Sequence, residues 1–403
     1  MEIRDVISEI LLFNQDLDPR RVRLKYHRMR EDAFSFFRAT CHLFYRTLPQ
    51  NPIFTQAPKV WISGDLHLEN FGSYKGDNRL AYFDLNDFDE ACLAPCTLEL
   101  LRVLTSILVA SDRFELGARL RTDLCKSFVR SYISEAMSEK PRWIERSLSK
   151  GLIKNLFKAV KSIDRRSFLE SRSIVKGKQR RLIIDGVKAF ATPKRESDGV
   201  VKTLEAFAEM QKNSEFYRVL DIADRISGLG SLGVSRYVLL VEGRGTPSGN
   251  FLLDLKEARS SSLGKAFSSI QPHWENDAER VVAIQKRCQA ISPALLSTLS
   301  INGRPFILKE LQPSEHRVNL DRWRGKILQK EEVLGSMGAL SAWSQIRSSG
   351  YKGAASSEEI AHFASEENWA SGLIQCAFEK ARLFQDYYRN YCRAFDDRVF
   401  EKN

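Results

Sequence analysis

The sequence predicts an α+β protein with a large helical part and a smaller β-rich part. Apolar residues recur at steps of three and four along residues 34–48, which is typical of a helix with one buried face. Two short apolar runs, at 60–62 and 80–83, each end in a polar cluster, as strands that carry functional groups do. A glycine-rich turn within 226–241 leads into a further strand-like run. A chain of 403 residues whose residue pattern changes in this way from helical to strand-like favours two lobes over one.

Composition and cysteine usage indicate a globular protein in a reducing compartment. Hydrophobic residues make up 43% and charged residues 28% of the chain, which is ordinary for a soluble protein. Acidic residues interrupt the first apolar positions, so we expect no signal peptide, and the apolar run 103–110 is too short to span a bilayer. The seven cysteines are scattered and form no C-x-x-C pair, which favours reduced thiols and a cytoplasmic location.

The formal net charge of +11 favours anionic partners: nucleotides, phosphorylated substrates, nucleic acid or an acidic surface. Basic runs concentrate in residues 141–195, and we interpret them as a solvated face or as a docking surface for an acidic substrate. This region has no interleaved aromatic pattern and no known reader motif, which argues against nucleic acid. The expected partners are therefore a nucleotide and an acceptor, either a small molecule or a protein.

We expect three segments along the chain. Residues 1–204 are predicted to form a helical lobe that carries the catalytic and metal-binding loops. Residues 205–322 are predicted to form a small β-rich lobe with a glycine-rich loop and one helix. Residues 323–403 are predicted to be helices that return to the first lobe.

A helix over residues 98–108 is apolar nearly all round and is expected to lie buried beneath the catalytic strands. Glu99 and Arg102 on this helix either support the catalytic loops or pair with each other. Arg38, on the earlier helix, is either an exposed helix residue or reaches an acidic or phosphate group of the site.

The first polar cluster contains Asp65 and Asn70 in the spacing D-x-x-x-x-N, which is that of the catalytic Asp and metal-binding Asn of phosphotransferases. Such an Asp accepts a hydroxyl proton, and a neutral Asn oxygen binds Mg²⁺ without adding charge. In the second cluster, Asp84 is the expected second metal ligand, with Asp87 as a further candidate. The alternative is that both clusters are turns in which Asp and Asn side chains bond local backbone.

The segment G-L-G-S-L-G provides Gly228, Gly230, Ser231 and Gly233 as candidate phosphate-binding residues. A lone G-x-G-x-x-G more often means a tight turn, and no helix follows this one, as a dinucleotide-binding fold requires. It opens a strand instead, as the loop that covers the phosphates in kinases does. Backbone N–H groups at glycines can approach phosphate closely.

A lysine on a following strand reaches the phosphates in such an arrangement. Lys256 is our candidate and Lys309 the reserve, although each is also compatible with an ordinary strand lysine. A helix over residues 277–290 offers a partner for this lysine. Glu279 lies in its first turn, where the helix dipole alone favours an acid, and Gln285 lies nearer its centre, so both stay open.

Taken together, these motifs resemble an uncharacterised bacterial family, domain of unknown function 2252. The resemblance covers most of the chain, and the two aspartate clusters are its specific part. It rests on F-F-R at 36–38, G-D-L-H-L-E-N-F-G at 64–72, F-D-L-N-D-F-D-E at 83–90, L-L-R at 100–102, G-L-G-S-L-G at 228–233, L-K-E-A at 255–258 and R-V-V-x-x-Q-x-R at 280–287.

More distantly, G-D-L-H-x-x-N followed by F-D is similar to the catalytic segment of aminoglycoside and choline phosphotransferases, which have the protein-kinase fold. This resemblance implies ATP and Mg²⁺, with Asp65 as general base and Asn70 and Asp84 as metal ligands. His67 matches the small-molecule kinase version of the loop. In kinases the glycine-rich loop precedes the catalytic loop, whereas here it follows, which implies a circularly permuted two-lobed kinase-like fold. D-L-N also stands in place of D-F-G.

Three classes of function fit these residues. The first is an ATP- and Mg²⁺-dependent phosphotransferase, or a nucleotidyltransferase that uses the same groups in another pose. The second is a catalytically silent kinase-like nucleotide-binding protein. The third is a metal-dependent phosphoesterase, which ranks last because its sites need several clustered histidines and the six here are scattered.

Overall fold

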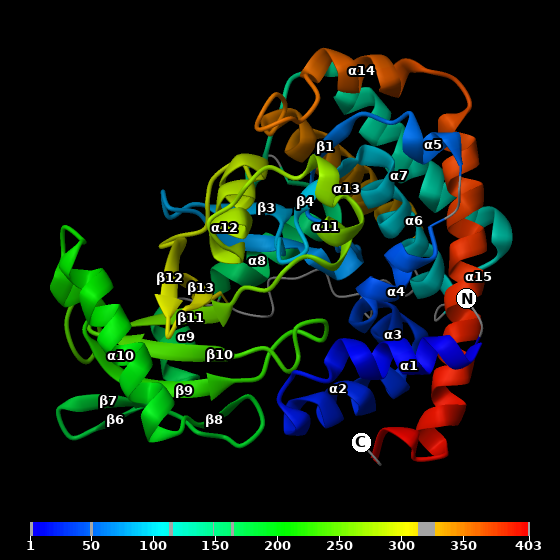
Figure 1. Ribbon diagram of the computed structural model, residues 1–403. Coiled ribbons are helices and arrows are strands. Elements are labelled where there is room, and N and C mark those ends of the chain that lie inside the picture. Colours follow the sequence, from blue (N-terminus) through cyan, green and yellow to red (C-terminus); the bar gives the residue numbers. More distant parts are fainter. Residues whose placement is uncertain are drawn as a thin grey trace.

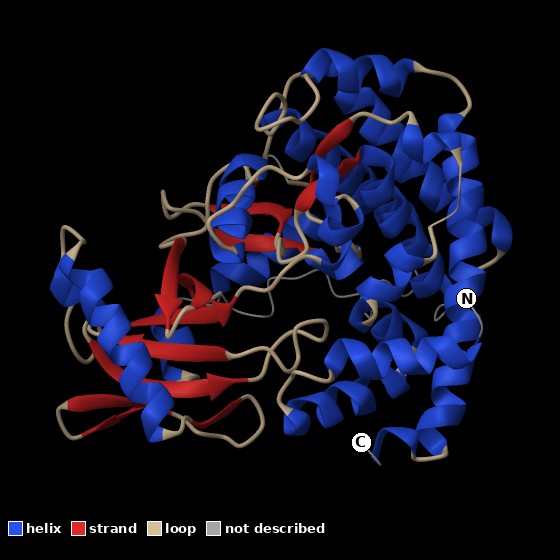
Figure 2. Cartoon of the chain, in the orientation of Figure 1, coloured by secondary structure: helices blue, strands red, loops and turns tan. Residues whose placement is uncertain are grey.

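The computed structural model describes residues 3–48, 51–112, 116–147, 149–162, 165–312 and 327–401. It is an α+β structure, as predicted from the sequence. Most helices gather into one body, and an antiparallel sheet lies beside it with its own helix across one face (Figures 1 and 2). None of the helices in these described ranges is long and apolar enough to cross a bilayer.

The helical body is built around α6 (Cys96–Asp112), which is buried along nearly its whole length. This confirms the prediction of a helix that is buried nearly all round. The long α15 (Trp369–Asp396) runs along one side of the body (Figure 1) and contributes Phe384 to an aromatic cluster with Phe37 and Phe44. The other main helices of the body are α1 (Ile3–Asn14), α2 (Pro19–Glu31), α3 (Ala33–Ala39), α4 (Cys41–Arg46), α5 (Pro52–Thr55), α7 (Ala118–Ser138), α8 (Gly151–Ser162), α13 (Ile327–Arg347) and α14 (Ser357–Ser365).

Short strands over α6 carry the two polar clusters. Strand β1 (Lys59–Ile62) pairs antiparallel with β4 (Cys92–Pro95). Strand β2 (Phe71–Lys75) forms a hairpin with β3 (Ala81–Leu85), and β5 (Ile144–Glu145) adds to its edge. The segments between these strands, residues 63–70 and 86–91, thus start from a fixed base. A 3₁₀ turn, η1 (Leu68–Asn70), ends the first segment.

The larger sheet has the strand order β12-β13-β11-β10-β9-β8 and is antiparallel throughout. Helix α10 (Lys194–Glu209) covers one face, while α12 (Asp277–Cys288) lies between the sheet and the helical body (Figure 1). The strands are β8 (Ala189–Ala191), β9 (Val219–Arg225), β10 (Arg236–Val241), β11 (Phe251–Glu257), β12 (Ser297–Ile301) and β13 (Arg304–Glu310).

The sheet-bearing lobe begins earlier than the predicted boundary at residue 205. Helix α10 lies largely before that boundary, yet Val200, Leu204 and Phe207 on it bury against the sheet. Strand β8 precedes the boundary as well and pairs with β9. The basic region of 141–195 therefore contributes to this lobe, through α9 (Arg165–Glu170), β6 (Ser173–Lys176), β7 (Gln179–Leu182) and β8.

Strand β11 shows why the sheet has one polar area. Its side chains alternate, so Phe251, Leu253 and Leu255 pack in the core beneath α10. Asp254 and Lys256 point to the opposite face, which is apolar near α9 and charged toward the helical body. This charged area faces the two short-strand segments that carry the polar clusters.

Candidate active site

The segment after β1 is held against the segment before β4 by a backbone contact at Gly64. Gly64 has a φ of +83°, and a Cβ atom there would overlap the carbonyl group of Glu90. Only glycine fits this position without strain. Glu99 of α6 accepts hydrogen bonds from the N–H (2.6 Å) and hydroxyl (2.7 Å) of Ser63. It therefore supports the loop, which was one of the two predicted alternatives.

Arg102 supplies the other support, since its side chain is fully buried and binds Asp65. Its Nε and Nη2 both donate to Oδ1 of Asp65, at 2.9 and 2.7 Å, and Nη2 also donates to the carbonyl of Phe37. Burial raises the pKa of Asp65, and the charge of Arg102 opposes that shift. Asp65 is thereby a fixed carboxylate with a raised pKa, which suits a proton acceptor.

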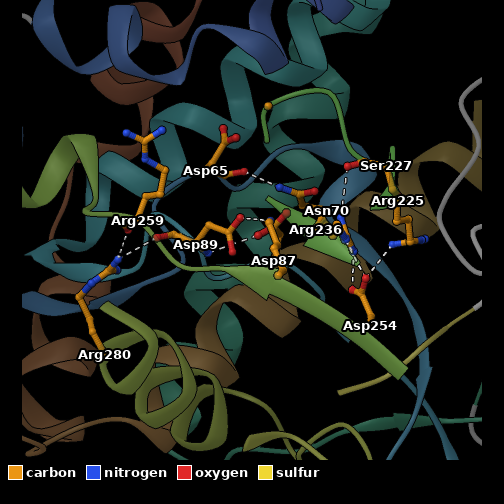
Figure 3. Close-up of polar contacts among 12 residues, drawn as sticks. Asp65, Asn70, Asp87, Asp89, Arg225, Ser227, Arg236, Asp254, Arg259 and Arg280 are labelled. Atoms are coloured by element: carbon orange, nitrogen blue, oxygen red, sulfur yellow. Dashed lines mark hydrogen bonds and ion pairs between the residues drawn. The ribbon is translucent and has the colours of Figure 1, made fainter. Parts of the chain in front are cut away.

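Asn70 lies beside Asp65, and its amide orientation follows from its partner. Its Nδ2 donates to the backbone carbonyl of Asp65 at 2.8 Å (Figure 3), so its Oδ1 is directed elsewhere. Both residues line a cavity of about 790 Å³. His67 also lines this cavity, but its Nδ1 accepts the N–H of Glu69 at 3.2 Å and caps the 3₁₀ turn. Arg38 lines it too and pairs with Glu69 at 2.5 Å.

The structure places Asp84, predicted as a metal ligand, apart from the cavity that contains Asp65. Strand β3 stays paired with β2 as far as Leu85, so Asp84 lies within the sheet and is only 1% exposed. Its carboxylate accepts the N–H groups of Leu85 (2.9 Å) and Ala290 (3.1 Å) and pairs with Arg347. Asp84 lines none of the cavities that contain Asp65 or Lys256.

Asp87 and Asp89 follow β3 and do line the cavity with Asp65. The N–H of Asp89 donates to Asp87 Oδ1 at 3.3 Å, which orders the turn between them (Figure 3). The predicted candidate Asp87 therefore lines the same cavity as Asp65 and Asn70. Asp89 was not singled out from the sequence, where an alternating D-x-D is also typical of a solvated turn.

The glycine-rich loop joins β9 to β10 and extends from the sheet toward α1 and α2 (Figure 1). A Cβ atom at Gly230 would lie 3.9 Å from Asp65 Oδ2, so the tip of the loop lies over the second carboxylate oxygen. The buried amino group of Lys25 donates to Asn14 Oδ1 (2.8 Å) and to the carbonyl of Gly230 (3.4 Å). Lys25, which sequence reasoning missed, is one of many basic residues on α2 and has no distinguishing signal there.

The predicted loop residues divide into two groups. Gly228, Gly230 and Ser231 line the cavity. Gly233 does not, and its φ of +104° and contact with Leu17 instead give it a role in the turn. Gly228 also adopts a positive φ, +79°, which favours glycine there.

A narrow continuation of this cavity reaches the sheet. Asp87, Asp89, Gly228 and Ser231 line both parts, and Lys256 appears on the far wall. Lys256 forms an ion pair with Asp89. The cavity thus connects Asp65 to Lys256, although nearly 200 residues separate them in sequence.

Three further candidate residues were predicted near Lys256, and not all of them line this cavity. Lys309 and Gln285 line it, and burial lowers the pKa of Lys309. Glu279 does not: its carboxylate accepts the N–H of Glu275 at 2.8 Å and its own N–H bonds Asn276 at the start of α12. Glu279, considered for cofactor binding, therefore lies outside this cavity, at a position that caps the helix.

The donor set fits a hard cation that brings its own anionic ligands. In the described ranges, no three His, Cys, Asp or Glu side chains are grouped closely enough to hold a metal by themselves. Among the oxygens that line the cavity are those of Asn70, an amide, and Asp87, a carboxylate. Mg²⁺ commonly takes one or two protein ligands and completes its shell with phosphate and water.

Comparison with known protein families identifies the family of this chain. Residues 17–394 match the model of a family described as "Uncharacterized protein conserved in bacteria (DUF2252)". The chain belongs to the DUF2252 family. No curated protein and no solved structure matches it. The DUF2252 match includes Asp65, Lys256 and Lys309, whereas the cavity residues of α1, such as Phe13, precede the matched range.

One further feature of this DUF2252 chain was not predicted. Asp254 accepts two hydrogen bonds from Arg236, at 2.7 and 2.5 Å, and one from Arg225 at 3.0 Å (Figure 3). These residues flank the glycine-rich loop on the polar face of the sheet. The alternation of Asp254 with Lys256 was a usable signal, because a charge at an inward strand position needs a partner.

Proposed function

We propose that this protein is an ATP- and Mg²⁺-dependent transferase with a kinase-like, circularly permuted arrangement, which moves a phosphorus-containing group to a hydroxyl acceptor. The observation that carries the proposal is the continuous cavity that joins Asp65, Asn70 and Asp87 to Gly228, Ser231 and Lys256. These are the residue types that phosphotransferases use at the acceptor, metal and phosphates.

The order of elements supports the kinase-like part of the proposal. From β9 to β13 the elements are a strand, a glycine-rich loop, a second strand, a lysine-bearing strand, the short helix α11 (Ser262–Ala266) with a 3₁₀ turn, helix α12 and two more strands. Apart from α11 and the 3₁₀ turn, this order matches the phosphate-binding lobe of kinases. Here the catalytic segment precedes this unit in the chain, and the final helices α13–α15 join the helical body.

Each residue has a defined task in this account. Asp65, held by Arg102 at one oxygen, takes the proton of the acceptor hydroxyl at the other. Asn70 and Asp87 would hold Mg²⁺, which supplies charge neutralisation for the phosphates. Lys256 and the backbone N–H groups of the glycine-rich loop bind phosphate oxygens. Gln285 lines the wall beside Lys309, where many kinases have a glutamate.

Thermal unfolding with ATP tests the proposal. We expect ATP to raise the melting temperature only when Mg²⁺ is present, because the proposed phosphate ligands need the metal. Turnover of ATP that Asp65→Ala abolishes, while a surface variant such as Lys178→Gln retains it, would separate an enzyme from a silent nucleotide-binding protein. Absence of any ATP protection would leave a phosphoesterase as the better alternative.

The compartment stays a prediction. All cysteines in the described ranges are free thiols, and most are buried. This is compatible with the reducing cytoplasm that we expect from the sequence.

A further inference from the structure

Among the described residues, four lysine and arginine side chains line the wide part of the cavity, which contains Asp65: Arg38, Arg46, Arg259 and Lys265. Arg38 forms an ion pair with Glu69, and Arg46 forms one with Glu9. Neither Arg259 nor Lys265 pairs with an acid in the part of the chain that the structure describes. Two positive charges at this cavity therefore lack an acidic partner, and an anionic ligand would compensate them.

The backbone at Arg259 is fixed on both sides of the residue. Arg259 follows the lysine-bearing strand β11 by two positions. The N–H of Ala258 donates to the carbonyl of Pro305 at 2.9 Å. The carbonyl of Arg259 accepts a hydrogen bond from Nη2 of Arg280 at 2.9 Å (Figure 3). The direction in which the Arg259 side chain leaves the backbone is thereby set.

Arg280 also ties this segment to the polar segment at residues 86–91. Its side chain is buried, with 6% of the residue exposed. Nη2 donates to the carbonyl of Asp89 at 3.1 Å, and Nη1 donates to the carbonyl of Ala91. One buried guanidinium group thus fixes Arg259 relative to the loop that carries the cavity carboxylates.

The side chain of Arg259, in contrast, is exposed. Its guanidinium group makes no hydrogen bond or ion pair within the described ranges. Figure 3 shows that the side chain extends away from Arg280, on the side of the cluster where Asp65 lies. A fixed backbone that presents an unpaired guanidinium group to a cavity favours a ligand-binding role over a structural one.

The pKa of Lys25 gives independent support for the position of the Arg259 charge. Burial lowers the pKa of Lys25 to about 8, with Arg259 adding to that effect and Glu90 and Asp65 opposing it. Arg259 and Asp65 both lie close enough to this one buried amino group to change its pKa. The two side chains therefore belong to the same part of the cavity.

A cation beside the proposed base has a definite use in the proposed reaction. The transition state of phosphoryl transfer spreads negative charge over the non-bridging oxygens of the transferred group. A guanidinium group is always charged and offers several N–H donors in a planar fork, which suits two such oxygens at once. Lys256 lies in the narrow part of the cavity, so the wide part has Arg259 for this purpose.

Resting on the proposed function, we propose that Arg259 is a further catalytic residue, which contacts the transferred phosphorus group and stabilises its charge in the transition state. The acceptor oxygen forms a bond to the phosphorus, and its proton passes to Asp65. The bond from the phosphorus to the bridging oxygen of the leaving phosphate breaks, and the electron pair stays on that oxygen. The guanidinium group of Arg259 donates hydrogen bonds to the non-bridging oxygens during this step.

Turnover of ATP with Mg²⁺ and water as acceptor, measured with the full-length protein, tests this role. Arg259→Gln is expected to lower kcat by about 10²–10³-fold, the usual scale for a lost donor to transition-state charge. The affinity for Mg²⁺-ATP, measured by calorimetry, is expected to stay close to that of wild type. Arg259→Lys keeps the charge without the fork and is expected to recover part of the rate. The melting temperature is expected to be unchanged in both variants, because the side chain has no partner to lose.

Vanadate gives a readout that needs no turnover. Its five-coordinate form resembles the phosphorus centre during transfer. Calorimetry is expected to show that wild type binds inorganic vanadate with Mg²⁺, and that Arg259→Gln binds it about tenfold more weakly. Arg304→Gln is the matched control: Arg304 pairs with Glu257 at the end of β11 but lines neither part of the cavity. This control is expected to match wild type in both rate and vanadate affinity.

The outcomes separate this inference from the proposed function. Equal rates or equal vanadate affinities in wild type and Arg259→Gln would overturn the inference and leave the proposed transferase standing. A loss of Mg²⁺-ATP affinity that accounts for the whole loss of rate would overturn it too, because Arg259 would then only bind the nucleotide. Failure of wild type to bind and turn over ATP with Mg²⁺ would overturn the proposed function, and this inference with it.

Discussion

Arg102 binds one oxygen of Asp65 through two hydrogen bonds and leaves the other oxygen beneath Gly230. Arg102 is fully buried, and its guanidinium also lies 3.7 Å from the centre of the Phe37 ring. Side chains that are fixed in this way lose little freedom when a substrate binds. The relationship makes Asp65 a fixed carboxylate rather than a mobile one, as the proposed role of general base requires.

The pH dependence of turnover tests this relationship. Burial raises the pKa of Asp65 above its usual value of 3.8, and Arg102 opposes that rise. The base works when ionised, so the rate increases with pH as Asp65 loses its proton. Arg102→Met removes the opposing charge, raises the pKa of Asp65 further and is expected to shift the rising limb to higher pH. Arg102→Lys keeps the charge and is expected to shift it less.

If the rate of turnover rises over the same pH range in wild type and in Arg102→Met, the role of Asp65 as the titrating base is contradicted. Asp65→Asn is expected to slow turnover by roughly 10²-fold or more, the usual scale for a lost general base. Its nucleotide affinity, measured by calorimetry, is expected to stay close to that of wild type.

Asp87 and Asp84 are expected to respond differently to the same substitution. Asp87→Asn is expected to weaken Mg²⁺-dependent ATP binding, because a carboxylate is lost from the cavity wall. Asp84→Asn is expected to lower the free energy of unfolding by about 1–3 kcal/mol, because its two backbone donors and Arg347 lose their ionised partner. Calorimetry and denaturant unfolding of both variants check the pair. A fall in Mg²⁺ affinity for Asp84→Asn alone would reverse the assignment.

Lys256 is expected to matter more for nucleotide binding than for folding. Its side chain is about 10% exposed and its partner Asp89 about 34% exposed, so Asp89 stays in contact with water when Lys256 is replaced. Lys256→Met is expected to raise the apparent KM for ATP with little change in melting temperature. Lys309→Met is the matched comparison on the neighbouring strand. A larger effect on KM from Lys309→Met would move the phosphate-binding role to that residue.

Gly64 is expected to be the least replaceable glycine of the site. Gly64→Ala is expected to lower the free energy of unfolding by about 3 kcal/mol or more, because it adds a steric overlap with Glu90 to the cost of a positive φ. Gly177 also has a positive φ, +62°, but nothing lies within 4 Å of its Cβ position. Gly177→Ala is therefore expected to cost only about 1–2 kcal/mol. Equal costs in urea unfolding would show that the two loops are not tightly packed at Gly64.

Local sequence patterns were sufficient to predict much of the candidate site. The spacing of Asp65 and Asn70 identified two residues that line one cavity, and the turn at Gly228 was correctly placed before a strand. Lys256 was correctly placed on a strand that follows this turn. These features depend on residues within one or two turns of each other, which is the range over which sequence periodicity carries information.

The errors came from long-range pairing. The sequence run 80–83 predicted a strand that ends before Asp84, but pairing with β2 continues that strand to Leu85 and buries Asp84. The partner of Arg102 is 37 positions away, and sequence spacing alone left an intrahelical pair with Glu99 equally open. The early start of the β-rich lobe likewise depends on how α10 docks against distant strands.

The most direct test of the central claim is a crystal structure with Mn²⁺ and a non-hydrolysable ATP analogue, in which the anomalous signal locates the metal. The account predicts a metal between Asn70 Oδ1 and the Asp87 carboxylate, with nucleotide phosphates reaching the amino group of Lys256. A metal at Asp84, or a nucleotide bound outside the cavity that joins Asp65 to Lys256, would contradict it.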